Sequence, residues 1–179
     1  MFRQVSTWDP SLVSAIRRHY TGSRGAPPGK KMAWVVSLNG QDVAWYGLGE
    51  PAYKLAPRRR LGLTDARPLE HTVCDFIYRL ETRELVASEL LAELQSEAAH
   101  GWAERYGWEP VHWETLVQPN AVATEVPGYC YRRIGYRSLG YTTGRSARRP
   151  PGNTHGPRVW SDAPKKLVLY RGPLRRVPL

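Results

Sequence analysis

The chain has 179 residues, of which 41% are hydrophobic and 11% are aromatic. This length gives one domain with a real core and is short for two, and the composition excludes a disordered chain. The formal net charge of +10 is unevenly distributed. Residues 1–127 carry 14 Lys and Arg against 15 Asp and Glu, a net of −1, whereas residues 128–179 carry 12 against one, a net of +11.

The cysteine, histidine and hydropathy patterns indicate whether the protein binds a metal, crosses a membrane or is secreted. Cys74 and Cys130 form no CxxC pair, and the five histidines have no ligand spacing, so the sequence predicts no metal site. The N-terminus lacks the apolar core of a signal peptide, and no apolar run approaches the length of a membrane span. These features predict a reduced, cytoplasmic protein with no membrane partner.

The apolar periodicity predicts an α+β (mixed α/β) domain built around one sheet. A first helix is expected from Asp9 or Ser11 to about Tyr20, and a second from Glu84 onward. A turn or short helix is expected over residues 129–134. Strands are expected over Met32–Leu38, Val43–Leu48, Thr72–Leu80, Val111–Val117, Tyr136–Thr142 and Lys165–Tyr170.

The C-terminal third is the basic part of the chain. Residues 145–157 have Pro, Gly and Arg without periodicity, which predicts a mobile start to a basic segment over 145–179. Just before it, residues 128–145 hold four tyrosines, four glycines and four arginines. Aromatic rings interleaved with cations favour DNA as the partner, and a solvated basic surface is the alternative. The residues predicted to contact nucleic acid are Tyr129, Arg132, Arg133, Tyr136, Arg137, Arg145, Arg148 and Arg149.

Four residues are candidates for catalysis: Ser88, Glu114, Tyr131 and His19. Ser88 lies in the first turn of the second helix, whose backbone N–H groups can hold a phosphate or a carbonyl oxygen, and a local helix hydroxyl without a ligand is the alternative. Strand alternation puts Glu114 on one face with His112, so Glu114 is either paired with an arginine or retuned as a base, and structural pairing is the safer interpretation. Tyr131 is a proton donor or a base-stacking ring, and a plain surface tyrosine or turn histidine remains the alternative at Tyr131 and His19.

The chain resembles the Druantia A type proteins over most of its length and in order. In the N-terminal half the resemblance lies in His19-Tyr20-x-Gly22 and in Gly29 with the hairpin AWYGLGEPAYKLAPR. In the middle it lies in Leu85-Val86-Ala87-Ser88 and in Arg105-Tyr106-Gly107 followed by Trp113-Glu114-Thr115-Leu116-Val117. Near the C-terminus it lies in Gly128-Tyr129-Cys130-Tyr131-Arg132 with Gly135-Tyr136, Leu139-Gly140-Tyr141-Thr142 and Gly144-Arg145. That family is similar to the phage Mom proteins, which alter adenine in phage DNA on a fold resembling the GNAT acyltransferases.

The resemblance implies a single GNAT-like domain over residues 1–179, with a central mixed, mostly antiparallel sheet flanked by helices. It also implies a phage-encoded protein that works in a bacterial host cell. Tyr131 matches the tyrosine that acts as general acid in GNAT enzymes, and Arg83, Ala87 and Ser88 lie at the cofactor-binding turn. This turn has no glycine and carries two glutamates, which disfavour a pyrophosphate. The cofactor is therefore unassigned, with acyl-coenzyme A as one candidate.

Three functions follow from these observations. The first is a phage-type enzyme that transfers a small group to a nucleobase amine in DNA, adenine favoured, with Glu114 as base, Tyr131 as proton donor and Ser88 stabilising an oxyanion. The second is a DNA-binding GNAT-like module without catalysis, and the third is a small-molecule acyl-CoA N-acyltransferase. The sequence leaves the oligomeric state open, with a homodimer as one option.

Overall fold

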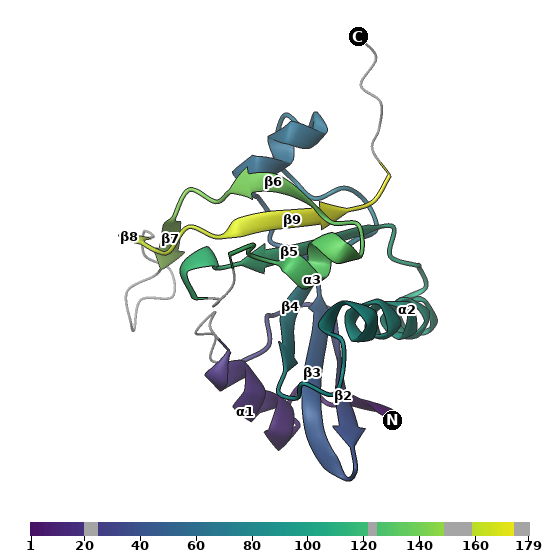
Figure 1. Cartoon of the computed structure of the whole chain (residues 1–179). Coiled ribbons are helices and arrows are strands. Elements are labelled where there is room, and N and C mark those ends of the chain that lie inside the picture. The colour runs from purple at the N-terminus through teal and green to yellow at the C-terminus, as the bar shows by residue number, and fades with distance from the viewer. Residues whose placement is uncertain (20–24, 122–124, 149–158, 174–179) are drawn as a thin grey trace.

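A seven-stranded sheet in the order β1-β2-β3-β4-β5-β9-β6 forms the centre of the molecule (Figure 1). The computed structural model describes residues 1–19, 25–121, 125–148 and 159–173. The strands are β1 (Phe2–Val5), β2 (Lys31–Leu38), β3 (Gln41–Gly49), β4 (Thr72–Leu80), β5 (His112–Val117), β6 (Arg137–Tyr141) and β9 (Leu167–Arg171). Neighbouring strands are antiparallel except β4 and β5, which pair in parallel. The expected α+β class and the mostly antiparallel sheet are confirmed.

Two helices of different lengths cover opposite faces of the sheet. One face carries α2 (Ala87–Tyr106) with the short α3 (Tyr129–Arg133), and the other carries α1 (Pro10–Arg18). The cores show this division: Trp34 of β2 packs with Leu94 of α2, whereas its neighbour Val35 packs with Leu12 of α1. The alternation of side chains along β2 therefore builds two separate hydrophobic layers. The described elements also include the 3₁₀ helices η1 (Ala56–Leu61) and η2 (Pro119–Ala121).

Helix boundaries follow local capping chemistry. Asp9 is the N-cap of α1, and its carboxylate accepts hydrogen bonds from the backbone N–H groups of Ser11 and Leu12 at 2.9 and 3.3 Å. The helix α2 begins at Ala87, three residues later than expected, and ends where Gly107 adopts a left-handed φ of 79°. No helix in the described ranges combines the length and apolar character needed to cross a membrane.

Two elements differ from the expectations. The edge strand β1 was not predicted, because its residues FRQV alternate weakly and are mostly exposed. Residues 145–157 were predicted to be a mobile segment without periodicity, and within them Arg145–Arg148 forms β7, which pairs with β8 (Val159–Asp162) in a separate two-stranded sheet. No strand was predicted at β7, because cross-strand pairing with a distant segment does not show in local composition. Residues 149–158 lie outside the described residues.

A β-bulge in β4 decides which side chains face α2. Gly47 of β3 pairs with Ile77, but the next residue, Leu48, pairs with Asp75, so Phe76 is an extra residue in β4. An extra residue swaps every following side chain to the other face. Asp75 therefore faces α2, whereas Ile77 packs in the α1 layer and Tyr78 returns to the α2 side. Gly47 makes room for the Phe76 ring, since a Cβ at Gly47 would overlap that ring.

We expect Gly47→Ala to lower the free energy of unfolding by about 1–3 kcal/mol, because the added methyl forces the Phe76 ring out of its place. Urea unfolding followed by fluorescence measures the change. The double variant Gly47→Ala/Phe76→Ala removes the overlap, so its cost must be smaller than the sum of the two single costs. Additive costs would contradict this account of the bulge.

Candidate functional site

The parallel strands β4 and β5 separate to form a fork. They pair only over Thr72–Asp75 against His112–Thr115, and beyond this point β4 follows β3 while β5 follows β9. Asp75 is thus the last paired residue of β4 before the strands part. A small cavity of about 20 Å³ lies in the fork. Its lining comes from both faces of the sheet: His19, Asp75, Phe76, Ile77, Tyr78, Thr115, Leu116 and Tyr131.

Asp75 is a buried carboxyl group, only 4% exposed, that is held by neutral hydrogen-bond donors. The Tyr46 hydroxyl donates to Asp75 Oδ1 at 2.6 Å, and Gln95 Nε2 lies 2.9 Å from Oδ2. The same Gln95 nitrogen lies 2.7 Å from the hydroxyl of Tyr136. Burial raises the pKa of Asp75 to about 7, although hydrogen bonds from Tyr46, Gln95 and Tyr131 and the charge of Arg171 oppose the rise. Asp75 can therefore gain and lose a proton near neutral pH.

Tyr131 lies at this fork, as part of a group of packed tyrosine rings. It belongs to α3, is buried, and makes edge contacts with Tyr78 and Tyr136 at centroid distances of 6.3 and 5.1 Å. Its place in the cavity lining fits a proton donor better than a ring that stacks on a base. Tyr136 is 4% exposed, so the expectation that it contacts nucleic acid is wrong: the ring is a core residue.

Glu114 is not part of the fork. The guanidinium of Arg58 donates to both carboxylate oxygens of Glu114, from Nε at 2.7 Å and from Nη2 at 2.6 Å. Both side chains are buried, and Arg58 Nη1 also donates to the carbonyl of Ala66 at 3.1 Å. This pair engages both carboxylate oxygens, so the fold contains the structural pairing of Glu114 with an arginine and does not place Glu114 at the fork, where a catalytic role was expected.

His19 comes to the fork from the other face. It follows the last residue of α1, is 7% exposed and lines the cavity. Burial and the nearby charge of Arg79 lower the pKa of His19 to about 4, so the imidazole is neutral at pH 7. The fork thus brings together two of the four catalytic candidates, His19 and Tyr131, with Asp75 between β4 and β5.

The turn before α2 is less acidic than its sequence indicates. Glu81 pairs with Arg18 at 3.3 Å and with Arg79 at 2.5 Å, so its charge is compensated. Val86, the N-cap of α2, gives no side-chain hydrogen bond, and the first-turn N–H groups are available to an anion. Arg83 is exposed beside them. The residues expected here, Ala87 and Ser88, are half-buried in that first turn and do not line the fork cavity.

The predicted nucleic-acid contacts divide into exposed and packed residues. Tyr129, Arg132 and Arg133 are exposed on α3. Arg137 is half-buried, with its guanidinium 5.4 Å from the centroid of the Tyr170 ring. Arg145 and Arg148 belong to β7, and Arg149 lies outside the described residues. Within the described ranges, no three His, Cys, Asp or Glu side chains gather as they would around a metal ion.

Two buried polar residues, Asp75 at the fork and its partner Gln95 on α2, were not among the predicted site residues. Asp75 stands in the apolar strand TVCDFIYRL, and Gln95 stands on the apolar side of α2 beside Leu91 and Leu94. A charged or amide side chain in such a place needs buried partners. That mismatch was the available signal, and it points to Asp75 more directly than the Trp-Glu-Thr context points to Glu114.

No protein-family model matches this chain, and no curated protein matches its sequence. Similarity exists among solved structures. A ribosomal-protein-alanine N-acetyltransferase from Brucella melitensis has a TM-score of 0.53 at 14% identity, over 96% of this chain and 98% of that one. An aminoglycoside 6′-acetyltransferase type Ii has 0.53 at 12%, over 99% of both chains. A GNAT-like decarboxylase, GphF, in complex with isobutyryl-CoA has 0.55 at 13%, over 98% and 100%.

These likenesses, together with the sheet order and the fork, show that the chain has the GNAT fold. At 12–14% identity they describe the backbone arrangement and leave the substrate open.

The buried pair predicts a large difference between two adjacent arginines. We expect Arg58→Met to lower the free energy of unfolding by about 3–5 kcal/mol, because it leaves the Glu114 charge buried and unpaired. Arg59→Met, at an exposed position, should change it by less than about 0.5 kcal/mol. Urea unfolding compares the two. Adding Glu114→Leu to Arg58→Met should recover most of the loss, and equal costs for the two arginine variants would contradict the pairing.

The pKa of Asp75 predicts how stability depends on pH. A carboxyl group whose pKa rises from 3.8 to about 7 on folding binds more protons folded than unfolded between these values. The folded state therefore loses stability as pH rises from about 4 to 7, by about 3–4 kcal/mol. The Asp75→Asn variant has no carboxyl group at this position, so it does not lose stability in this way. Its unfolding free energy minus that of the natural chain should therefore increase as pH rises from about 4 to 7. A constant difference would contradict the assignment.

Proposed function

We propose that this chain is a GNAT-fold group transferase that modifies a nucleobase amine in DNA, adenine favoured, with Asp75 as the general base. The observation that carries the proposal is the buried Asp75 carboxyl group at the β4–β5 fork, with a pKa of about 7. A base is most effective when its pKa lies near the working pH. Asp75 thus replaces Glu114 in the role that the sequence suggested.

The fork residues have complementary proton chemistry. When an amine attacks an activated carbon, the nitrogen must lose a proton, and the Asp75 carboxylate is placed to accept it. Tyr131 lines the same cavity and bears a hydroxyl that can give a proton to the leaving group. His19 is neutral and adds no positive charge beside the nitrogen, which becomes positively charged as it attacks. The cavity now has room for about one water molecule, so catalysis requires the fork to widen.

The start of α2 is the candidate site for the phosphate end of a donor such as acyl-coenzyme A. Its first-turn N–H groups have no side-chain cap, Arg83 is exposed beside them, and Glu81 is neutralised by Arg18 and Arg79. The exposed Glu84 and Glu89 enter none of the ion pairs between described residues, so their charges oppose a phosphate there. When bound, such a donor supplies a carbonyl group activated as a thioester. Ala87 and Ser88 contribute their backbone N–H groups to the phosphates.

Charge supports DNA as the acceptor. The last third of the chain has a net charge of +11, and Tyr129, Arg132 and Arg133 are exposed on α3, the helix that also carries Tyr131. A cationic, aromatic surface next to the fork suits a DNA strand with an extruded base. The resemblance to the Druantia A type and phage Mom proteins supports the same acceptor.

A DNA-binding module without catalysis is the second candidate. The observation that favours it is the Arg58–Glu114 pair, which removes one expected base, together with the small volume of the fork. Such a module binds DNA in a salt-dependent way and leaves the bases unchanged.

The proposal predicts a modified nucleoside in DNA from cells that express the natural chain. Asp75→Asn should reduce its amount by about 100-fold or more, because general-base catalysis contributes roughly this much. Mass spectrometry of nucleosides from digested DNA measures it. Asp65→Asn, which makes the same change of charge at an exposed position, should leave the amount unchanged.

Each alternative gives its own result in this experiment. DNA binding that falls with salt, without a modified nucleoside from the natural chain, would establish the second candidate. Turnover of acyl-coenzyme A that DNA does not affect would indicate the small-molecule acyltransferase. A modified nucleoside that persists in Asp75→Asn would overturn the role of Asp75.

A further inference from the structure

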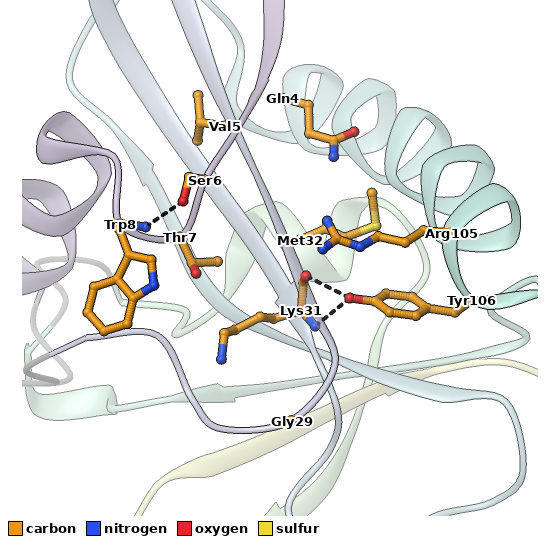
Figure 2. A pocket seen from close by; sticks show the side chains of 10 residues that line it. All are labelled: Gln4, Val5, Ser6, Thr7, Trp8, Gly29, Lys31, Met32, Arg105 and Tyr106. Atoms are coloured by element: carbon orange, nitrogen blue, oxygen red, sulfur yellow. Dashed lines mark hydrogen bonds between the residues drawn. The ribbon is translucent and has the colours of Figure 1, made fainter.

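A second cavity lies at the other end of α2, away from the fork. It has a volume of about 570 Å³ and lies between the loop after β1, the start of β2 and the last turn of α2 (Figure 2). This volume is within the range of about 300–1,000 Å³ that is typical of small-molecule sites. The residues that define its chemistry are Ser6, Thr7, Trp8, Lys31, Arg105 and Tyr106.

The cavity combines a free aromatic ring with uncompensated positive charge. Trp8 is 82% exposed, which is unusual for the largest apolar side chain. Figure 2 shows Trp8 at one side of the cavity and Arg105 with Tyr106 at the other, with Lys31 between them. None of the ion pairs between described residues includes Lys31 or Arg105.

The side of the cavity formed by Tyr106 is held in place by hydrogen bonds. The Tyr106 hydroxyl accepts from the backbone N–H of Lys31 at 3.1 Å and donates to the Lys31 carbonyl at 3.0 Å. The side chains of Lys30 and Arg105 both lie over the Tyr106 ring, at 5.4 and 5.5 Å from its centroid. The Lys31 ammonium donates to the carbonyl of Pro27 at 2.9 Å, a neutral partner that leaves its charge uncompensated. Two cations thus lie over the Tyr106 ring, and the Lys31 ammonium is a third cation in the cavity.

The loop that carries Trp8, on the opposite side of the cavity, is held by hydrogen bonds within itself. The backbone N–H of Trp8 donates to the Ser6 hydroxyl at 3.2 Å, and Asp9 N–H donates to the Ser6 carbonyl at 2.9 Å. Trp8 is therefore presented by a turn fixed to the start of α1. No carboxylate lines the cavity. Glu50 lies against Gly29, which is one of the lining residues.

We propose that this cavity binds a nucleoside phosphate unit, with the base stacked on Trp8 and the phosphate held by Lys31 and Arg105. A flat ring beside a pair of cations matches the two parts of a nucleotide, since bases stack on aromatic side chains and phosphates bind arginine and lysine. The hydroxyl groups of Ser6 and Thr7 offer hydrogen bonds to the sugar. An acidic peptide would use the cations and leave the Trp8 ring without a partner.

The site is independent of the transfer reaction proposed above. It lies at the end of α2 opposite to the first turn, and α2 has 20 residues, a length of about 30 Å. The nucleotide is either free or part of a single DNA strand. Both sources have the same chemistry, and binding measurements distinguish them without any catalytic step.

The test measures binding of a fluorescein-labelled single-stranded hexanucleotide to the full chain by fluorescence anisotropy, with unlabelled dAMP as competitor. Trp8→Ala should weaken binding about ten-fold, because one stacked base is lost, and Trp8→Phe should weaken it less. Arg105→Ala should reduce the slope of log K against log salt by about 0.7, the value for one phosphate contact. Arg59→Glu, at an exposed position on η1, serves as the control for a change of charge elsewhere and should leave binding near that of the natural chain.

The results that support the nucleotide site differ from those that overturn it. Competition by dAMP that is lost in Trp8→Ala identifies a site for the free nucleotide. Strand binding that dAMP does not displace but that Trp8→Ala weakens identifies a site on single-stranded DNA, and either result supports the proposal. Binding that Trp8→Ala and Arg105→Ala leave unchanged, or that polyglutamate displaces as well as dAMP does, overturns it. Asp75→Asn should bind the hexanucleotide like the natural chain, so failure of the transfer reaction and failure of this site give different results.

Discussion

The short parallel pairing of β4 and β5 is the constraint on which the site depends. Only four residues of each strand pair, and each strand then follows a different antiparallel neighbour. The separation leaves no strand to cover the end of the pairing, so side chains must fill it. Residues from α1, α3 and both strands meet there, which is why His19 and Tyr131, far apart in the sequence, line one cavity.

The adjacent strands β4 and β5 each carry a buried carboxyl group, Asp75 and Glu114, and the hydrogen-bond partners of each group determine its role. Cys74 pairs with Glu114 in the sheet, so Asp75 and Glu114 are neighbours in register but face opposite sides. An arginine donates to both oxygens of Glu114 in a bidentate pair. Neutral tyrosine and amide donors hold Asp75, and burial is then free to raise its pKa. The first arrangement stabilises the fold, whereas the second provides a group that can exchange a proton.

Local patterns predicted most of the fold. Alternation and turn signals gave the strands from β2 to β6 and β9, and the capping residue Asp9 gave the start of α1. Patterns local to a strand could not show the bulge at Phe76, because it depends on how β4 pairs with Gly47 of β3. The same limit explains the site: Tyr131 was found through its segment, but the partner of Glu114 is an arginine 56 residues away. Asp75 and Gln95 meet only after α2 packs on the sheet.

The pairing of Arg58 with Glu114 also constrains how this protein can diverge. Arg58 comes from η1, in the long connection between β3 and β4, and its buried guanidinium ties that connection to the sheet. Loss of one partner leaves the other charge buried and unpaired, whereas an apolar pair of similar volume is tolerated. In an alignment of relatives, positions 58 and 114 should therefore covary, with both charges kept or both lost.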